Sequence, residues 1–364
     1  HDWIGKLNLE YTLRPDHALN LNLYGTGTWQ QPHNELMDRS LGYPANFDSR
    51  LTALTTGLSY EAFFFDRRLQ TAVTAKHFLI GSRAQMLHNF YLRDIKTIHI
   101  NRSEWGANFA ACYRITPLWT VKGSVASEVR IPTSEELLGN SFNILPSPDL
   151  LPERNKSVNA GVLYRRPFSD DRVWEAEFNV YMSELTDMVR FTPDLLPTMA
   201  RYTNFGQVRT MGIEAEIKAD VTRWCYLYAN GTWQDLRDRR RTFPNSKAPN
   251  PTYDLRIPNI PYLMANFGGE LHWADLFGRG QNTRLLLDAS YVHRYSYDFE
   301  MGAYLEKLIP TSLTFDAAIE QSFANRRWTL TLKVKNLTDR ETVSEFNRPL
   351  PGRTCSVKLR YLLR

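Results

Sequence analysis

The residues best suited to hold a charged ligand form one short basic run. Arg237, Arg239, Arg240 and Arg241 stand around Asp238 in the sequence R-D-R-R-R. Guanidinium groups bind carboxylates and phosphates through paired hydrogen bonds, so the run is a candidate site for an anion. Solvated surface charge explains the same run without any ligand, and that is the simpler interpretation.

The sequence holds no catalytic constellation. The patterns G-x-S-x-G, H-E-x-x-H, G-x-x-x-x-G-K and C-x-x-C are absent. Cys112, Cys225 and Cys355 lie more than 100 residues apart, which favours small side chains filling the fold over a disulfide or a metal site. We therefore predict no enzyme, no catalytic residue, no metal site and no cofactor.

In the segments that position these residues, apolar and polar residues alternate with a period of two. In the C-terminal part the apolar positions are Trp328, Leu330, Leu332 and Val334, then Cys355, Val357, Leu359 and Tyr361, with polar residues between them. Alternation of this kind predicts strands with one apolar and one polar face. We count about fifteen such segments, most of about 10–14 residues, a length that suits tilted membrane-spanning strands.

Short and long connections alternate between these segments. Short ones are expected at 14–17, 66–68, 116–118, 168–172, 220–223, 273–281 and 324–327, and long ones at 32–50, 82–102, 130–156, 185–208, 238–259, 296–311 and 338–352. Up-and-down barrels of the outer membrane have short periplasmic turns and long extracellular loops. Trp119, Trp174, Trp224 and Trp328 each follow a short connection, as expected for a periplasm-side aromatic girdle.

Composition agrees with an all-β membrane wall in a single domain over residues 1–364. Mean hydropathy is −0.42, and no run of 18 apolar residues exists, which excludes a helical membrane protein. Lys and Arg number 44 against 39 Asp and Glu, a mild and dispersed excess that does not indicate nucleic acid. An odd number of strands leaves open edges, so further strands are expected from elsewhere.

Three stretches then give a resemblance to a known family. Residues 128–153 (E-V-R-I-P-T-S-E-E-L-L-G through S-P-D-L-L-P-E) resemble the segment F-R-A-P-T-x-E-E-L … N-P-D-L-x-P-E of TonB-dependent outer-membrane receptors. Residues 202–216 are similar to that family's Y-x-N-x-G … T-x-G-x-E, and 336–354 to its N-L-F-D … P-G-R-T ending. The matched positions are Arg130, Pro132, Glu135, Glu136, Leu137, Pro148, Asp149, Leu150, Pro152, Glu153, Asn204, Gly206, Gly212, Glu214, Asn336, Asp339, Pro351, Gly352 and Arg353.

The resemblance implies active transport of a scarce ligand across the outer membrane of a Gram-negative bacterium. In the family the ligands are siderophores, haem, cobalamin or oligosaccharides. No histidine stands between the two halves of the motif at 130–150, which disfavours haem, while His88 and His99 keep it open. The rivals are a structural or secretion-associated barrel and a passive porin.

The family's barrel has 22 strands around an N-terminal plug, so this chain is expected to hold about the last fifteen strands. The plug, through which TonB would act, and the first strands are expected outside it, through truncation, nicking or a second chain. Outer-membrane lipid and lipopolysaccharide are the other expected partners. Arg237, Arg239, Arg240 and Arg241, with Tyr297 and Phe299, are the candidate contacts for a ligand or for lipopolysaccharide.

Overall fold

The computed structural model describes residues 1–31, 35, 39, 48–89, 94–140, 144–193, 200–242, 247–299, 308–323, 327–345 and 348–363. It holds two compact units. The first comprises His1–Tyr113, Gly123–Val158 and Ser183–Val208, and the second Arg114–Lys122, Asn159–Met182 and Arg209–Arg364.

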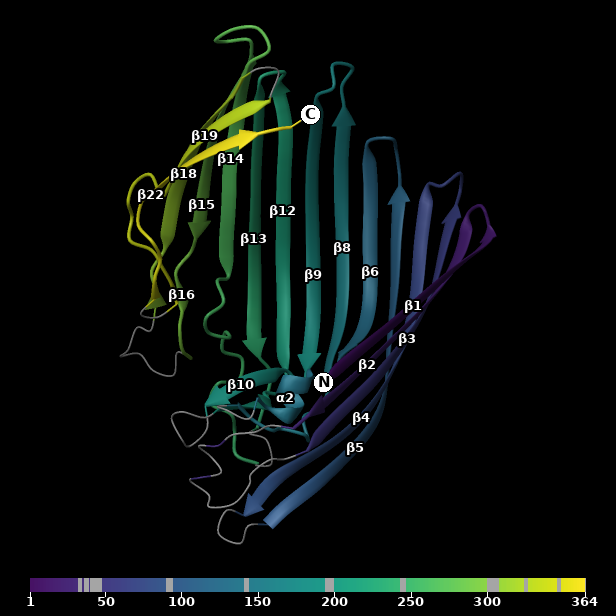
Figure 1. Cartoon of the computed structure of the whole chain (residues 1–364). Coiled ribbons are helices and arrows are strands. Elements are labelled where there is room, and N and C mark those ends of the chain that lie inside the picture. Colours follow the sequence, from purple (N-terminus) through teal and green to yellow (C-terminus); the bar gives the residue numbers. More distant parts are fainter. Residues whose placement is uncertain are drawn as a thin grey trace. The chain divides into compact units, whose positions relative to one another are not determined.

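Fifteen long strands form one sheet in chain order, as the alternation predicts. Its strands are β1 (Asp2–Arg14), β2 (His17–Gln30), β3 (Ser49–Phe64), β4 (Leu69–Asn89), β5 (Asp94–Arg114), β6 (Trp119–Arg130), β8 (Glu153–Pro167), β9 (Val173–Thr186), β12 (Val208–Thr222), β13 (Cys225–Asp238), β14 (Leu263–Ala274), β15 (Asn282–Val292), β18 (Ser312–Phe323), β19 (Trp328–Lys335) and β22 (Thr354–Tyr361). The up-and-down order is visible in Figure 1.

The long connections contain smaller elements. These are α2 (Ser134–Leu138), β7 (Ile144–Leu145), β10 (Val189–Pro193), β11 (Ala200–Asn204), β16 (Tyr295–Ser296), β17 (Leu308–Ile309), β20 (Val343–Glu345) and β21 (Arg348–Pro349). In the first unit β10, β11 and β7 make a three-stranded sheet with one parallel pair, β11 with β7. No helix among the described residues combines the length and apolar character needed to cross a membrane.

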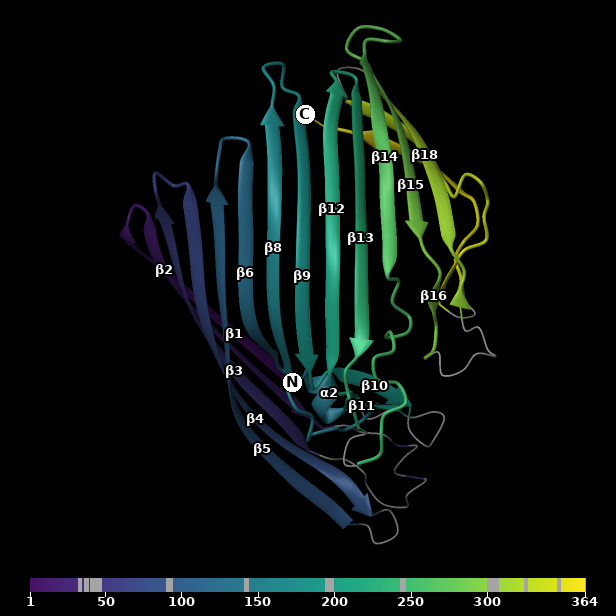
Figure 2. The same ribbon diagram turned by 180° about the vertical axis from the view of Figure 1, so that it is seen from behind.

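One expected connection is mostly strand. Residues 82–102 were predicted as a long loop, yet β4 and β5 are 21 residues each and stay paired from Leu69 with Tyr113 to Asn89 with Asp94. Ala84 of this stretch is fully buried in the apolar cluster of the first unit, and the Arg102 side chain donates to the Asp149 carbonyl, so tertiary contacts support the extension. Figure 2 shows the two strands running on together. Residues 324–326 and most of 32–50, also predicted as connections, lie outside the described residues.

Each unit exposes its apolar positions on one face of its strands. In the first unit Leu54, Leu58, Val73, Leu79 and Trp105 are 43–64% exposed. In the second unit the predicted apolar positions Ile319, Leu332, Val357, Leu359 and Tyr361 are likewise exposed, and Ile319, Leu332 and Val357 lie in register. We call this side the apolar face of each unit. The predicted faces of β18, β19 and β22 are therefore confirmed.

Candidate functional site

A short helix marks the end of the first unit where the long connections lie. Thr133 caps α2: its hydroxyl accepts a hydrogen bond from the Glu136 amide, and the Glu136 carboxylate accepts one from the Thr133 amide. This reciprocal pair satisfies two amides that the first helical turn leaves unpaired. Gly139 ends the helix with a φ of 71°, where a Cβ would collide with the backbone of Ile144 and Pro146.

The helix packs on the side of β3 and β4 opposite the apolar face. Leu137, Leu138 and Leu150 are at most 5% exposed and cluster with Leu51 of β3 and Ile80 of β4. These apolar contacts hold the connection against the strands. We call the described residues of 131–152 and 187–206 the cap.

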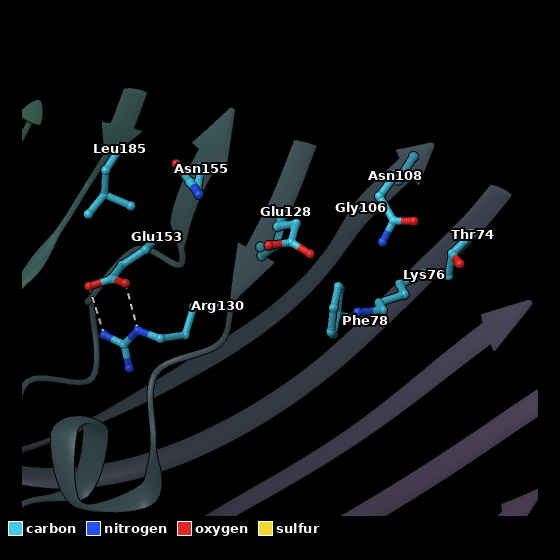
Figure 3. Close-up of a pocket in the computed structure, with 12 residues that line it drawn as sticks. Thr74, Lys76, Phe78, Gly106, Asn108, Glu128, Arg130, Glu153, Asn155 and Leu185 are labelled. Carbon is cyan, nitrogen blue, oxygen red and sulfur yellow. Dashed lines mark hydrogen bonds and ion pairs between the residues drawn. The ribbon is translucent and has the colours of Figure 1, made fainter. Parts of the chain in front are cut away.

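Arg130 joins the cap to the strands. Its Nε and Nη2 donate to the two carboxylate oxygens of Glu153 at 2.7 and 2.9 Å, and its Nη1 donates to Glu136 at 2.9 Å. Glu153 also accepts the Val189 amide of β10 at 2.6 Å. Figure 3 shows the pairing of Arg130 with Glu153. Through Glu153 and Glu136, one guanidinium connects the ends of β6 and β8 with α2.

Two groups, one next to the cap and one within it, have shifted pKa values. Glu153 is the fifteenth residue counted back from the short-connection end of β8, beyond the span of about 11 residues that crosses a membrane. Burial raises its pKa, but the hydrogen bonds from Arg130 and the Val189 amide outweigh burial, so its pKa is lowered. The pKa of Tyr202, on β11, is raised by burial and by the nearby charges of Glu135 and Glu136.

Asn204 holds the two halves of the cap together. Its side-chain amide donates to the carbonyls of Leu151 at 3.0 Å and Asp187 at 2.7 Å, and its oxygen accepts the Leu151 amide at 2.9 Å. Gly206 follows with a φ of 106°, a conformation that side chains rarely adopt. Asn204 and Gly206 of the second motif therefore stabilise the fold of the cap.

The remaining residues of the first motif are placed within the same cap. Pro132, Pro148 and Pro152 are buried, Glu135 is exposed in the first turn of α2, and the Asp149 carbonyl accepts Arg102 at 3.2 Å. The structure thus brings together the first motif and Asn204 with Gly206 of the second.

A recess of about 230 Å³ lies beside the Arg130 cluster on the capped side of the strands. Lys76, Asn108, Glu128 and Asn155 line it together with Arg130, as Figure 3 shows. The Asn155 side-chain oxygen is buried there without a hydrogen-bond partner among the described residues. The recess offers charged side chains and the unsatisfied Asn155 oxygen, which suits a small polar group.

The basic run of the second unit is folded into ion pairs. Asp238 is fully buried and accepts Arg240 at 2.6 and 3.0 Å, Asn250 at 3.0 Å and Thr252 at 2.6 Å. Arg237 donates to Asp235 at 2.6 Å. We call residues 235–256 the arginine loop.

The other arginines of this loop differ among themselves. Arg239 donates to Asp254 at 2.6 Å and lies over the Tyr253 ring. Arg241 is exposed, and its guanidinium makes no ion pair within the described ranges. The Tyr297 carbonyl accepts Asn259, and the Phe299 amide is bonded to Asp298. Among the described residues, no hydrogen bond or cation–π contact joins Phe299 to these arginines.

In the second unit, the structure shows why one further motif position is a glycine. The Tyr181 ring covers Gly212 so closely that any Cβ there would overlap it. Met211 and Ile213 lie on the apolar face, and Glu214 lies on the opposite side.

The C-terminal motif closes on itself. The Asn336 side chain bonds the Arg340 backbone in both directions, at 2.8 and 3.0 Å, and Asp339 accepts the Arg353 amide at 2.7 Å. A Cβ at Gly352 would stand 2.9 Å from the Asp339 carboxylate. Pro351 is exposed beside it. The two halves of this motif are thus bound together as one connection.

Sequence reasoning missed the helix and the carboxylates of the arginine loop. The capping signature Thr133-x-x-Glu136 predicts a helix start, and Asp235, Asp254 and Arg256 each stand two residues from an opposite charge. Both signals were present in the sequence.

Long antiparallel strands, exposed apolar faces and connections sorted by length define a large up-and-down barrel wall of the outer-membrane class. The chain belongs to the TonB-dependent receptor-like β-barrel family, whose model matches residues 1–337. No curated protein matches by sequence.

Solved structures share the fold. The copper transporter OprC is 16% identical with a TM-score of 0.71, over 98% of this chain and 55% of that one. The FrpB iron transporter from Neisseria meningitidis (F5-1 variant) is 13% identical with a TM-score of 0.71, over 99% and 55%. The ferric citrate transporter FecA in the unliganded form is 14% identical with a TM-score of 0.67, over 98% and 54%. The chain spans about half the length of these proteins.

Proposed function

We propose that this chain is part of the wall of a Gram-negative outer-membrane transporter that takes up a scarce ligand with energy delivered through TonB. The family match over residues 1–337 carries the proposal. Similar structures named as iron, ferric citrate and copper transporters support a metal or a metal chelate as cargo. Siderophores, haem, cobalamin and oligosaccharides are the candidate ligand classes.

The cap supports a role in ligand capture rather than open diffusion. Apolar burial, the Arg130 cluster and Asn204 hold a folded connection against the inner side of β3 and β4. A passive pore has no need of such a structure, whereas a receptor needs a firm surface from which ligand-contacting residues project. TonB would act through a plug region, and another segment or chain would supply the remaining strands.

Uptake by cells with and without the encoding gene tests the proposal. The probes cover the candidate classes: ⁵⁵Fe-labelled ferric citrate, a ferric catecholate siderophore, haem, ⁶⁴Cu, labelled cobalamin and a labelled oligosaccharide, each with and without a protonophore. We expect the deletion to abolish energy-dependent accumulation of one probe and the protonophore to have the same effect. Unchanged uptake of every probe, or uptake that ignores the protonophore, would contradict the proposal; the second result with conductance in planar bilayers would indicate a porin.

A further inference from the structure

Two arginines of the first unit stand apart from the paired ones. Arg50 of β3 and Arg83 of β4 are direct register partners, and both are exposed. Neither guanidinium has a carboxylate partner in the described part of the chain, unlike Arg130 or Arg240. His99 of β5 is the register partner of Arg83 and is also exposed. We call these three residues the arginine row.

The row lies on the apolar face. Residues Arg50, Thr52 and Leu54 alternate along one side of β3, and Leu54 is 43% exposed there. On the other side of the row, Arg50 lies over the ring of Trp29, its register partner on β2, at 4.7 Å from the ring centre. The positive charges and the apolar positions therefore share one surface.

The height of the row follows from the strand register. Counting pairs from Phe64 with Leu69 at the short connection, Leu54 with Leu79 is the eleventh and Arg50 with Arg83 the fifteenth. A tilted strand crosses the hydrocarbon core in about 9–11 residues. The apolar positions thus end near Leu54 and Leu79, and the arginines stand just beyond, at the level of lipid headgroups.

Two separate hollows lie along these strands, one at the arginines and one at Leu54 and Leu79. One, of about 630 Å³, is lined by Arg50, Arg83, Trp29 and one carboxylate, that of Asp48. The other, of about 560 Å³, includes Leu54, Leu79, Gly25 and Gly81. The Trp3 ring lies against Gly25, where a Cβ would stand 3.0 Å from it, so the glycine keeps room for the indole.

We infer that the arginine row binds the phosphate of a phosphorylated acyl-glycolipid of the outer leaflet, with acyl chains against Leu54 and Leu79. Two guanidiniums without a carboxylate partner among the described residues, next to a hollow that Leu54 and Leu79 line, match an anionic headgroup that carries acyl chains. The inference rests on the proposed function in one respect, that the strands stand in an outer membrane.

Lipid binding to the intact protein, extracted from cell envelopes in detergent, tests this inference. Native mass spectrometry follows titration with bis-phosphorylated lipid A and with its fully dephosphorylated counterpart. We expect the phosphorylated form to bind tighter, and R50Q/R83Q to weaken its binding by about tenfold or more. R50K/R83K should retain most of the binding, and millimolar inorganic phosphate should not displace the lipid.

The matched control removes two charges from the other end of the same hairpin. R67Q/R68Q, in the turn between β3 and β4, should bind lipid A as the wild type does. Equal binding by R50Q/R83Q and wild type, an equal loss in the control, or displacement by phosphate alone would overturn the inference. Envelope fractionation is read separately: recovery outside the outer membrane contradicts the proposed function, whereas recovery in it with unchanged lipid binding contradicts only this inference.

Discussion

The arginine loop of the second unit and the arginine row of the first place the same side chain in opposite electrostatic settings. In the loop, Asp235, Asp238 and Asp254 neutralise arginines that are close in sequence. In the row, Arg50 and Arg83 are 33 positions apart in the chain and meet only through strand register. Most arginines that are adjacent in the sequence are thus neutralised by carboxylates of their own loop. The exposed positive surface comes instead from two arginines that are distant in the sequence.

The comparison shows that burial and ion pairing, rather than the number of basic residues, decide whether an arginine is available to a partner. A buried carboxylate must be satisfied by hydrogen bonds, so the residues around Asp238 are held for structural reasons. Exposed and unpaired arginines gain little from the fold, which leaves them available to a partner. Substitutions in the loop should therefore affect stability, and substitutions in the row should affect binding.

The largest effect is expected at Asp238. Asp238→Ala leaves Arg240, Asn250 and Thr252 without their acceptor and should destabilise the loop by about 3–5 kcal/mol. Hydrogen exchange over residues 247–256 measures this opening. Glu341→Gln, an exposed carboxylate of another connection, is the control and should leave exchange unchanged. Wild-type protection in Asp238→Ala would mean that the loop does not depend on this ion pair.

Arg130→Lys is the next test, because the cap also uses a paired arginine. Lysine keeps the charge but cannot donate to Glu153 and Glu136 through a planar fork. Since the Arg130 side chain is 42% exposed, we expect a loss of only about 1–2 kcal/mol, seen as faster proteolysis of residues 131–152. Arg68→Lys, in an exposed turn, is the matched control. Equal proteolysis of both variants would show that the Arg130 hydrogen bonds do not stabilise the cap.

The lowered pKa of Glu153 gives the cap a pH dependence. A carboxylate with a depressed folded pKa stabilises the cap above its unfolded pKa of about 4.3, and this contribution is lost as pH falls further through the folded pKa. Proteolysis of the cap by pepsin should therefore rise as pH falls below about 4. Glu153→Gln should show a weaker pH dependence. A similar pH dependence in both proteins would assign the effect to other groups.

Much of the wall could be predicted from the sequence, because alternation and strand length are local properties. Leu332 and Val357 lie on the predicted face, and the family motifs lie at long connections. The extension of β4 and β5 was not predicted, since a paired extension and a long loop differ only in tertiary contacts, such as that of Ala84 with the apolar cluster of the first unit. The ring over Gly212 likewise comes from a neighbouring strand.

The site was harder to predict than the wall. The role of Arg130 depends on Glu153, 23 positions away, and on the amide of Val189. The arginine run is conspicuous in the sequence because its charges are adjacent. Its neutralisation is not, because Arg237 and Arg239 both pair with Asp254, which lies across a turn. Arg50 and Arg83 carried no local signal at all, because only register brings them together.

The smallest effect on stability should come from the arginine row, and this prediction sharpens the contrast most. R50Q/R83Q removes two exposed cations that have no carboxylate partner within the described ranges, so the stability of the folded wall should change by less than about 0.5 kcal/mol. The loss of the Arg50 contact with Trp29 is the one expected cost, and at an exposed site it is small. Thermal unfolding of the detergent-solubilised protein, followed by the β-sheet circular dichroism signal, measures this directly. A large drop in the melting temperature would show that the row supports the fold, as Asp238 and Arg240 do in the loop. An unchanged melting temperature would show that these two charges do not stabilise the fold, in contrast to the charges of the arginine loop.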